Sequence, residues 1–231
     1  QYAGLTILKF TKGKLTERSY QSCLIDTITQ VDPYIARKVN SFMEQPEFKE
    51  VIGATSLPFK SQESIGNIVT DAMRCSAASD LAFYNQGGIR LSELPLGDIT
   101  LETILSIEPF GNHIVIHELS LADIKALILN HFNQGDHMID LYVSPGNYTI
   151  IQDQQGKGIN VIFKDHHGRP LAEKNTYKVA LNNYVSIEYD FPDKGKGLHT
   201  DISVVNAMVD FIRTNSPLAP TDKRTYLSSV K

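Results

Sequence analysis

The sequence predicts a mixed α/β (α+β) fold, a layered sandwich of mixed sheets and helices, rather than a doubly wound parallel sheet. Helical and extended patterns alternate in the first half of the chain. The second half is rich in short extended runs separated by Gly, Asp and Asn turns, and one amphipathic helix over 204–212 closes the pattern. Hairpins that follow a mixed region are typical of layered domains, whereas a parallel sheet requires regular alternation of strand and helix.

Residues 1–48 are expected to form a β element and a linking helix in front of the main domain, 49–231. Apolar and polar residues alternate over 5–10, Gly13 offers a turn, and a second extended run follows. Asp32-Pro33 is a typical helix start, because an Asp N-cap accepts free N–H groups and proline suits the first helical position. The apolar face of this helix comprises Ile35, Val39 and Phe42.

The main domain is expected to begin near residue 51. Its first helix has Ser61 or Ser64 as N-cap. Gly66 lies inside that helix at a cost of about 1 kcal/mol relative to Ala, which indicates close packing against another backbone. We further expect strands at 81–84, 114–116, 141–143, 148–151, 159–163 and 176–181, and helices at 101–105 after the cap Thr100, from Ser120 with Asp123 as a capping box, and at 204–212.

Composition limits the functional classes. The net charge of −4 and the pI of about 6.0 give no basic field for nucleic acid, although one or two cations suffice for a nucleotide. No apolar run reaches the roughly 18 residues of a membrane helix, so no transmembrane segment is expected. Gln1 is expected to be a processed or trimmed start, with any signal peptide removed. Cys23 and Cys75 are interpreted as free, partly buried thiols, with a single bridge in an oxidising compartment as the alternative.

The most informative segment is Asn85-Gln86-Gly87-Gly88-Ile89-Arg90, directly after the strand expected at 81–84. Gly87 and Gly88 allow positive φ and a close approach of the backbone to a ligand. The amide of Asn85 both donates and accepts hydrogen bonds, and the planar guanidinium of Arg90 suits a phosphate or a ribose edge. A tight hairpin turn with a solvent-facing arginine would also explain these six residues.

A second segment, Pro109-Phe110-Gly111-Asn112, follows the helix expected at 101–105. A ring held between proline and glycine can present its face, and a stacked base gains on the order of 1–3 kcal/mol in single-strand nucleic-acid complexes. Asn112 is suited to reading a base edge. A core aromatic at a strand start is the alternative for Phe110.

The third segment is the helix that contains Gly66, in which Asn67 and Asp71 lie one turn apart and are interpreted as a structural brace rather than a catalytic pair. In this order and spacing, the three segments resemble the C-terminal domain of the 5'-nucleotidase family. The resemblance covers about residues 51–226 and rests on the Gly-Asn-x-x-x-Asp-Ala-Met helix and the Asn-x-Gly-Gly-Ile-Arg turn. Residues 1–48 resemble the end of the family's catalytic domain and its linking helix.

In that family, the C-terminal domain closes over a nucleotide or nucleoside held by an N-terminal metallophosphatase domain with two divalent metals. The resemblance implies that Phe110 stacks on the base and that Asn112 contacts its edge. It implies that Asn85 and Arg90, on the Gly87-Gly88 turn, contact the ribose or the phosphates. It also implies a role in nucleotide catabolism and an extracytoplasmic location, which is periplasmic, secreted or surface-anchored, with a lipid anchor ahead of Gln1 left open.

Two stretches depart from the family pattern. The family often has an arginine just ahead of the Gly-Asn helix, where this chain has Ser61. The family's second base-stacking aromatic follows a glycine-rich turn, and the matching stretch here, 183–192, lacks those glycines but keeps Asp190. Tyr189 or Phe191 is therefore the candidate for the second ring, and a β-bulge with an exposed aromatic is the alternative.

No histidine stands in the Asp-x-His or Gly-Asn-His-Glu setting that two-metal phosphoesterases use to hold their metals. The chain also has no Gly-x-Ser-x-Gly sequence and no Walker-type loop. We therefore assign no catalytic residue, metal or cofactor to this chain and expect it to be inactive on its own. The leading hypothesis is a nucleotide-recognition domain whose two divalent metals lie in a separate metallophosphatase domain or partner chain.

Two alternatives stay open. The first is a stand-alone binding or scaffold protein on the same fold that no longer binds nucleotides, with Phe110 packed away and Arg90 held in an internal ion pair. The second is an independent enzyme with its own chemistry, which would use a carboxylate pair among Asp71, Asp80, Glu108 and Asp190.

Overall fold

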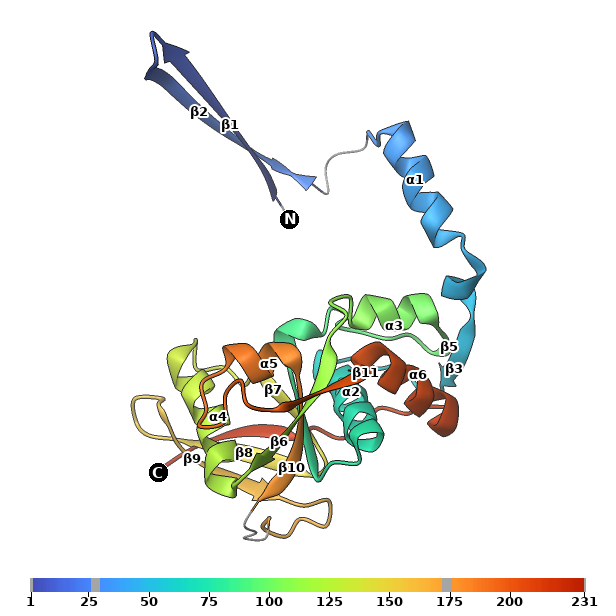
Figure 1. Ribbon diagram of the computed structural model, residues 1–231, viewed down its shortest axis with the longest axis vertical. Helices are drawn as coiled ribbons and strands as arrows, with labels where there is room; N and C mark the ends of the chain where they lie inside the picture. The colour runs from blue at the N-terminus through green and yellow to red at the C-terminus, as the bar shows by residue number, and fades with distance from the viewer. Residues whose placement is uncertain (1, 26–29, 172–175, 231) are drawn as a thin grey trace. The chain divides into compact units, whose positions relative to one another are not determined.

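The computed structural model describes residues 2–25, 30–171 and 176–230 (Figure 1). Contacts divide the chain into two compact units, Gln1–Pro46 and Glu47–Lys231. The first unit is a hairpin and a single helix, whereas the second contains two hydrophobic cores. The 3-10 helix η2 (Pro46–Lys49) begins at the boundary.

The first unit has the predicted hairpin and helix. Strands β1 (Tyr2–Thr11) and β2 (Lys14–Leu24) pair antiparallel, and α1 (Pro33–Met43) follows. The carboxylate of Asp32 accepts the first two free N–H groups of α1, which confirms the predicted N-cap. No residue of these three elements is buried, so the apolar side chains of both strands and of the helix face solvent within the unit.

The central element of the second unit is a five-stranded mixed sheet (Figure 1). Its strand order is β11 (Leu198–Ser203), β6 (His113–Leu119), β10 (Tyr177–Asn182), β4 (Leu81–Asn85) and β7 (Leu141–Ser144). Strands β10 and β4 are parallel, and the other neighbouring pairs are antiparallel. The carboxyl ends of β4 and β10 therefore meet the amino end of β6 at one edge of the sheet.

Over the described residues of this unit, two smaller sheets and five α-helices accompany the central sheet. The three-stranded sheet has the order β12 (Thr225–Ser229), β8 (Asn147–Gln152) and β9 (Gly158–Lys164), and β3 (Val51–Thr55) pairs with β5 (Gly97–Thr100). The helices are α2 (Gln62–Ala77), α3 (Leu101–Ile107), α4 (Leu121–Gln134), α5 (Asn183–Glu188) and α6 (Val204–Asn215), with a 3-10 turn η3 (Gln86–Gly88).

The side chains of β4 show how the layers form. Successive residues of a strand point to opposite faces, so Ala82 and Tyr84 belong to the core that includes α2 and α6. Leu81 and Phe83 belong to the core that includes α4 and the three-stranded sheet. The central sheet is thus covered on both faces by different kinds of layer, which confirms the predicted layered α+β class.

Most predicted elements are present, and the helix caps have the predicted residues. Ser61 caps α2, while Thr100 and Ser120 form capping boxes at α3 and α4. The sequence did not predict β3, β5, α5, β11 or β12. Residues 183–188 form a helix, so the β-bulge suggested for 183–192 is wrong over that part.

Two packing predictions need correction. A Cβ at Gly66 would overlap the ring of Tyr142, so this glycine makes room for an aromatic side chain and not for another backbone. Both cysteines are free, as expected, but both are exposed rather than partly buried. Cys23 lies on the exposed hairpin, and Cys75 lies near the end of α2 on its solvent side.

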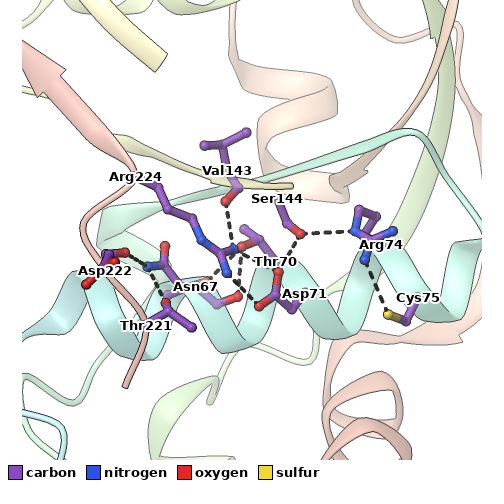
Figure 2. Close-up of polar contacts among 11 residues, drawn as sticks. Asn67, Thr70, Asp71, Arg74, Cys75, Val143, Ser144, Thr221, Asp222 and Arg224 are labelled. Atoms are coloured by element: carbon purple, nitrogen blue, oxygen red, sulfur yellow. Dashed lines mark hydrogen bonds and ion pairs between the residues drawn. The ribbon is translucent and has the colours of Figure 1, made fainter. Parts of the chain in front are cut away.

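The brace predicted on α2 joins this helix to the C-terminal segment (Figure 2). The Asn67 amide donates to the Thr221 hydroxyl at 3.0 Å and to the Asp222 carbonyl at 3.2 Å. Asp71 binds both terminal nitrogens of Arg224 at 2.8 and 2.9 Å. These contacts hold the segment that leads into β12 against α2, so both residues have the structural role that the sequence predicted.

Candidate functional site

A pocket of about 300 Å³ lies at the sheet edge where β4 and β10 end and β6 begins. Five of its lining residues were predicted from the sequence and one, Tyr184, was not. The lining residues are Asn85, Gly87, Gly88, Phe110, Asn112 and Tyr184. They come from three segments, namely the end of β4 with the η3 turn, the connection from α3 to β6, and the start of α5 after β10.

Phe110 presents its ring to solvent at this pocket. Its side chain is 54% exposed, so the alternative of a core aromatic is wrong. Gly111 follows with φ of +66°, a conformation that a residue with a Cβ rarely adopts, and the turn keeps the ring outside the core. The Arg90 guanidinium carbon lies 5.3 Å from the ring centroid, within the roughly 6 Å range of cation–π contacts.

Arg90 is itself exposed, and its side chain donates to the Gly87 carbonyl at 3.4 Å. Within the described parts of the chain, it has no recorded ion pair with a carboxylate. The scaffold alternative requires Phe110 to be packed away and Arg90 to be paired internally. This geometry therefore counts against that alternative.

The second exposed ring at the pocket belongs to Tyr184, whose side chain is 50% exposed. Tyr189 and Phe191, the two predicted candidates, are both 4% exposed and belong to the core beneath α4. Tyr189 stacks on His131 and donates its hydroxyl to Asp140. Asp190 is exposed but does not line the pocket. The structure therefore leaves Tyr189, Asp190 and Phe191 out of this pocket and adds Tyr184.

The two glycines of the η3 turn are not in the left-handed conformation that the sequence suggested. Gly88 is needed for a different reason, because a Cβ there would lie 2.5 Å from the Tyr84 ring. Gly87 has only the Asn85 amide nitrogen near the same position, at 3.6 Å. The close approach at Gly88 is thus made by an aromatic ring packed against the turn.

A buried hydrogen-bond network lies behind the pocket. Glu108 is fully buried, and its Oε1 accepts the Tyr84 hydroxyl at 3.1 Å and the Asn112 amide nitrogen at 2.6 Å. The same Asn112 nitrogen donates to the Tyr84 hydroxyl at 3.1 Å. Burial, and then the negative charge of Glu108, raise the pKa of Tyr84 well above its ordinary value, so this hydroxyl stays a donor.

Asn85 is oriented by a second network. Its amide oxygen accepts the Asn182 amide nitrogen at 2.9 Å, and both side chains are buried. The Asn182 oxygen in turn accepts the Val185 N–H at 2.9 Å, as the N-cap of α5. The strand ends of β4 and β10 and the start of α5 are therefore joined by side-chain amides.

A Ser–His–Asp arrangement, which the sequence did not predict, lies elsewhere in the same unit. His117 Nε2 lies 2.8 Å from the Ser186 hydroxyl, and its Nδ1 lies 2.8 Å from Asp193. A nucleophilic serine must reach its substrate. Ser186 and His117 are buried, so the arrangement fastens α5 and the following loop to β6 and offers no open nucleophile.

Comparison with known families decides the identity of the fold. The sequence model of one protein family, the 5'-nucleotidase C-terminal domain, matches residues 49–190 of this chain. The chain belongs to this family. The resemblance inferred from the glycine turn and the Gly-Asn helix is thereby confirmed.

Relatives of this 5'-nucleotidase C-terminal domain are longer proteins. Protein UshA of Yersinia enterocolitica is 24% identical in an alignment 252 residues long, and the alignment covers 94% of this chain and 44% of UshA. A cell wall protein of Listeria monocytogenes is 31% identical over 138 residues, which cover 54% of this chain and 17% of the relative. The solved structure of a 5'-nucleotidase precursor from Thermus thermophilus has a TM-score of 0.67 at 23% identity, over 97% of this chain and 49% of that one. The chain thus spans less than half the length of UshA and about half of the Thermus protein.

Three of the carboxylates considered for a catalytic pair have separate hydrogen-bond partners. Asp71 binds Arg224, Asp80 accepts the Lys178 N–H, and Glu108 lies behind the pocket, which gives no support to a carboxylate pair among them. No three His, Cys, Asp or Glu side chains of the described residues are placed to share a metal ion. No helix in the described ranges has the length and apolarity to cross a bilayer.

Proposed function

We propose that this chain is the nucleotide- or nucleoside-recognition domain of a 5'-nucleotidase-like phosphohydrolase. It supplies base and sugar recognition, and a metallophosphatase domain or partner chain supplies the two divalent metals and the hydrolytic step. The observation that carries the proposal is a pocket at the sheet edge with an exposed Phe110 ring, two amide side chains in its wall and Arg90 against the ring.

The dimensions and chemistry of the pocket fit a nucleoside. A volume of about 300 Å³ is at the lower end of small-molecule sites. A flat base gains on the order of 1–3 kcal/mol by stacking on an aromatic ring, and Phe110 and Tyr184 both offer exposed rings. Asn85 and Asn112 supply polar contacts, and Arg90 offers its guanidinium to a phosphate or to the ribose.

The exposed apolar surface of the first unit supports the proposal of a metallophosphatase domain next to it. An isolated two-stranded hairpin is marginally stable in water. Here the hairpin and α1 expose large apolar side chains, among them Ile7, Phe10 and Phe42. Such surfaces are typical of elements that pack against further structure. The chain also covers only 44% of UshA, so we assign the unit to the end of a metallophosphatase domain and its linking helix.

We further propose a role in nucleotide catabolism and an extracytoplasmic location, either periplasmic, secreted or surface-anchored. The Listeria relative is named a cell wall protein, which supports a place outside the cytoplasm. A lipid anchor on this protein remains part of the same proposal.

Ser61 is the observation that favours the scaffold alternative. It caps α2 where the family often has an arginine, so one expected phosphate contact is missing. Arg90 remains exposed next to the pocket, and for that reason we prefer nucleotide binding over a scaffold that has lost it.

Calorimetric titration of the chain with adenosine, AMP and UDP-glucose tests the proposal. Binding that is weakened by Phe110→Ala and by Arg90→Ala is the expected result. Absence of binding both to the chain alone and after addition of a metallophosphatase domain would favour the scaffold alternative. Chelator-sensitive phosphatase activity of the purified chain would contradict the assignment of the metals to a separate domain.

A further inference from the structure

The orientation of the Asn112 amide is fixed from behind the pocket. Glu108 Oε1 accepts the Asn112 backbone N–H at 3.4 Å and is therefore an acceptor, so the amide group that faces it at 2.6 Å is the nitrogen. The Tyr84 hydroxyl donates to Glu108 and accepts from the same nitrogen. Among the described residues, the Asn112 amide oxygen accepts no recorded hydrogen bond. This oxygen is the polar atom that Asn112 can offer to the pocket it lines.

Asn85 is fixed with the opposite polarity. The Asn182 oxygen accepts a backbone N–H, so the Asn182 nitrogen faces Asn85, whose oxygen accepts it at 2.9 Å. The Asn85 nitrogen is then the atom available to the pocket. The pocket is thus offered an acceptor by Asn112 and a donor by Asn85. Neither amide can turn over without losing its hydrogen bond to a buried side chain.

The burial of the Glu108 carboxylate indicates that this residue has a role other than packing. The side chain is fully buried, and its Oε2 has no hydrogen-bond partner in the described part of the chain. Leaving a buried oxygen unpaired is costly, and an apolar residue would fill the same space without that cost. Glu108 is nevertheless placed where its other oxygen, Oε1, fixes the amide of the pocket residue Asn112.

We propose that Glu108 is a positioning residue that makes the pocket selective for bases with an amino group at the edge facing Asn112. The inference rests on the proposed nucleotide binding. Adenine and cytosine have an amino donor where their oxo analogues, hypoxanthine and uracil, have a carbonyl acceptor. The Asn112 oxygen accepts from the amino group, whereas it meets a carbonyl oxygen in the analogue. AMP and CMP are therefore preferred over IMP and UMP.

Calorimetry on the whole chain with AMP against IMP, and with CMP against UMP, tests the inference. Each pair differs at the amino or oxo position and at the ring nitrogen beside it, while the ribose and phosphate are the same. We expect the amino ligand to bind about tenfold more tightly, the equivalent of one well-placed hydrogen bond. Equal affinities within both pairs, or tighter binding of the oxo ligands, would overturn the inference.

Glu108→Leu tests the positioning role. Leucine has no acceptor, so the Asn112 amide nitrogen loses the oxygen that holds it and the fixed orientation of that amide is released. The AMP-to-IMP affinity ratio should then fall towards one. A purely structural role would lower both affinities by the same factor and leave the ratio unchanged, and that result would overturn the assignment.

Asn112→Ala is the second variant, in case Glu108→Leu does not fold, and circular dichroism checks both. It removes the acceptor itself, so the ratio should again fall towards one, and a ratio that survives this change contradicts the inference. If the wild-type chain binds no nucleotide, with or without a metallophosphatase domain, the proposed function fails and the inference fails with it. Nucleotide binding with equal affinities within both the AMP/IMP and the CMP/UMP pair would overturn the inference alone.

Discussion

Arg224 and Asp71 form a two-pronged ion pair, with nitrogen–oxygen distances of 2.8 and 2.9 Å, between the C-terminal segment and α2 (Figure 2). The Arg224 side chain also donates to the Val143 carbonyl at the adjacent strand β7. One guanidinium thus joins a helix, a strand and the segment before β12. The pair is mostly buried, with side-chain exposures of 15% and 20%.

Asp71→Asn should destabilise the folded chain, because it leaves the Arg224 charge without its partner. We expect a loss of about 2 kcal/mol in the free energy of unfolding, below the value for a fully buried pair since both side chains keep some exposure. Denaturant unfolding measures the loss. The matched control is Arg213→Ala, which breaks an ion pair with Glu50 whose side chains are about half exposed, and it should cost less than about 1 kcal/mol. Equal losses in the two variants would contradict the bracing role.

Gly66→Ala should also destabilise the chain, although alanine favours helices by about 1 kcal/mol over glycine. The added methyl would overlap the Tyr142 ring, and overpacking of this kind costs on the order of 1–3 kcal/mol. Thermal unfolding measures the net effect. Gly135→Ala is the control, since its Cβ would be 3.5 Å from the nearest atom, and it should be close to neutral. A Gly66→Ala variant more stable than wild type would contradict the close contact with Tyr142.

The sequence predicted those parts of the site that lie within short segments. Asn85, Gly88, Phe110 and Asn112 reach one pocket because each lies within three residues of the end of β4 or the start of β6, and these strand ends meet at one edge of the sheet. Contacts between distant segments were not predictable in the same way. The His117 ring meets Ser186 because β6 pairs with β10, and no local pattern carries that pairing.

Tyr184 was missed because residues 183–192 were matched to the family's turn, which made Tyr189 or Phe191 the candidate for the second ring. The helix there is only six residues long and starts from Asn182, which serves both as the last strand residue and as the N-cap. The signal that could have found it is an asparagine at a strand end, a common N-cap. In this helix the Tyr184 side chain is exposed, whereas Val185 is buried.

Substitution of Tyr184 and of Tyr189 should have different effects on binding and on stability. Tyr184→Ala should leave the free energy of unfolding nearly unchanged and weaken nucleotide binding about tenfold, because its ring is exposed at the pocket. Tyr189→Ala should cost about 3 kcal/mol of stability, because it empties a buried site in the core. Thermal unfolding and calorimetry on both variants measure the two effects. If Tyr189→Ala folds normally and Tyr184→Ala binds like wild type, the assignment of the second ring to Tyr184 is wrong.

Ser186 should behave as a structural hydroxyl and not as a nucleophile. Its side chain is fully buried between His117 and the loop that carries Asp193, so a fluorophosphonate probe should not label the native chain. Ser186→Ala removes one buried hydrogen bond to the His117 ring and should cost about 1 kcal/mol of stability. Intact-mass measurement after exposure to the probe, with the Ser186→Ala variant as control, decides the question. A mass increase in wild type that disappears in the variant would mean that the loop opens and that the Ser–His–Asp arrangement is chemically competent.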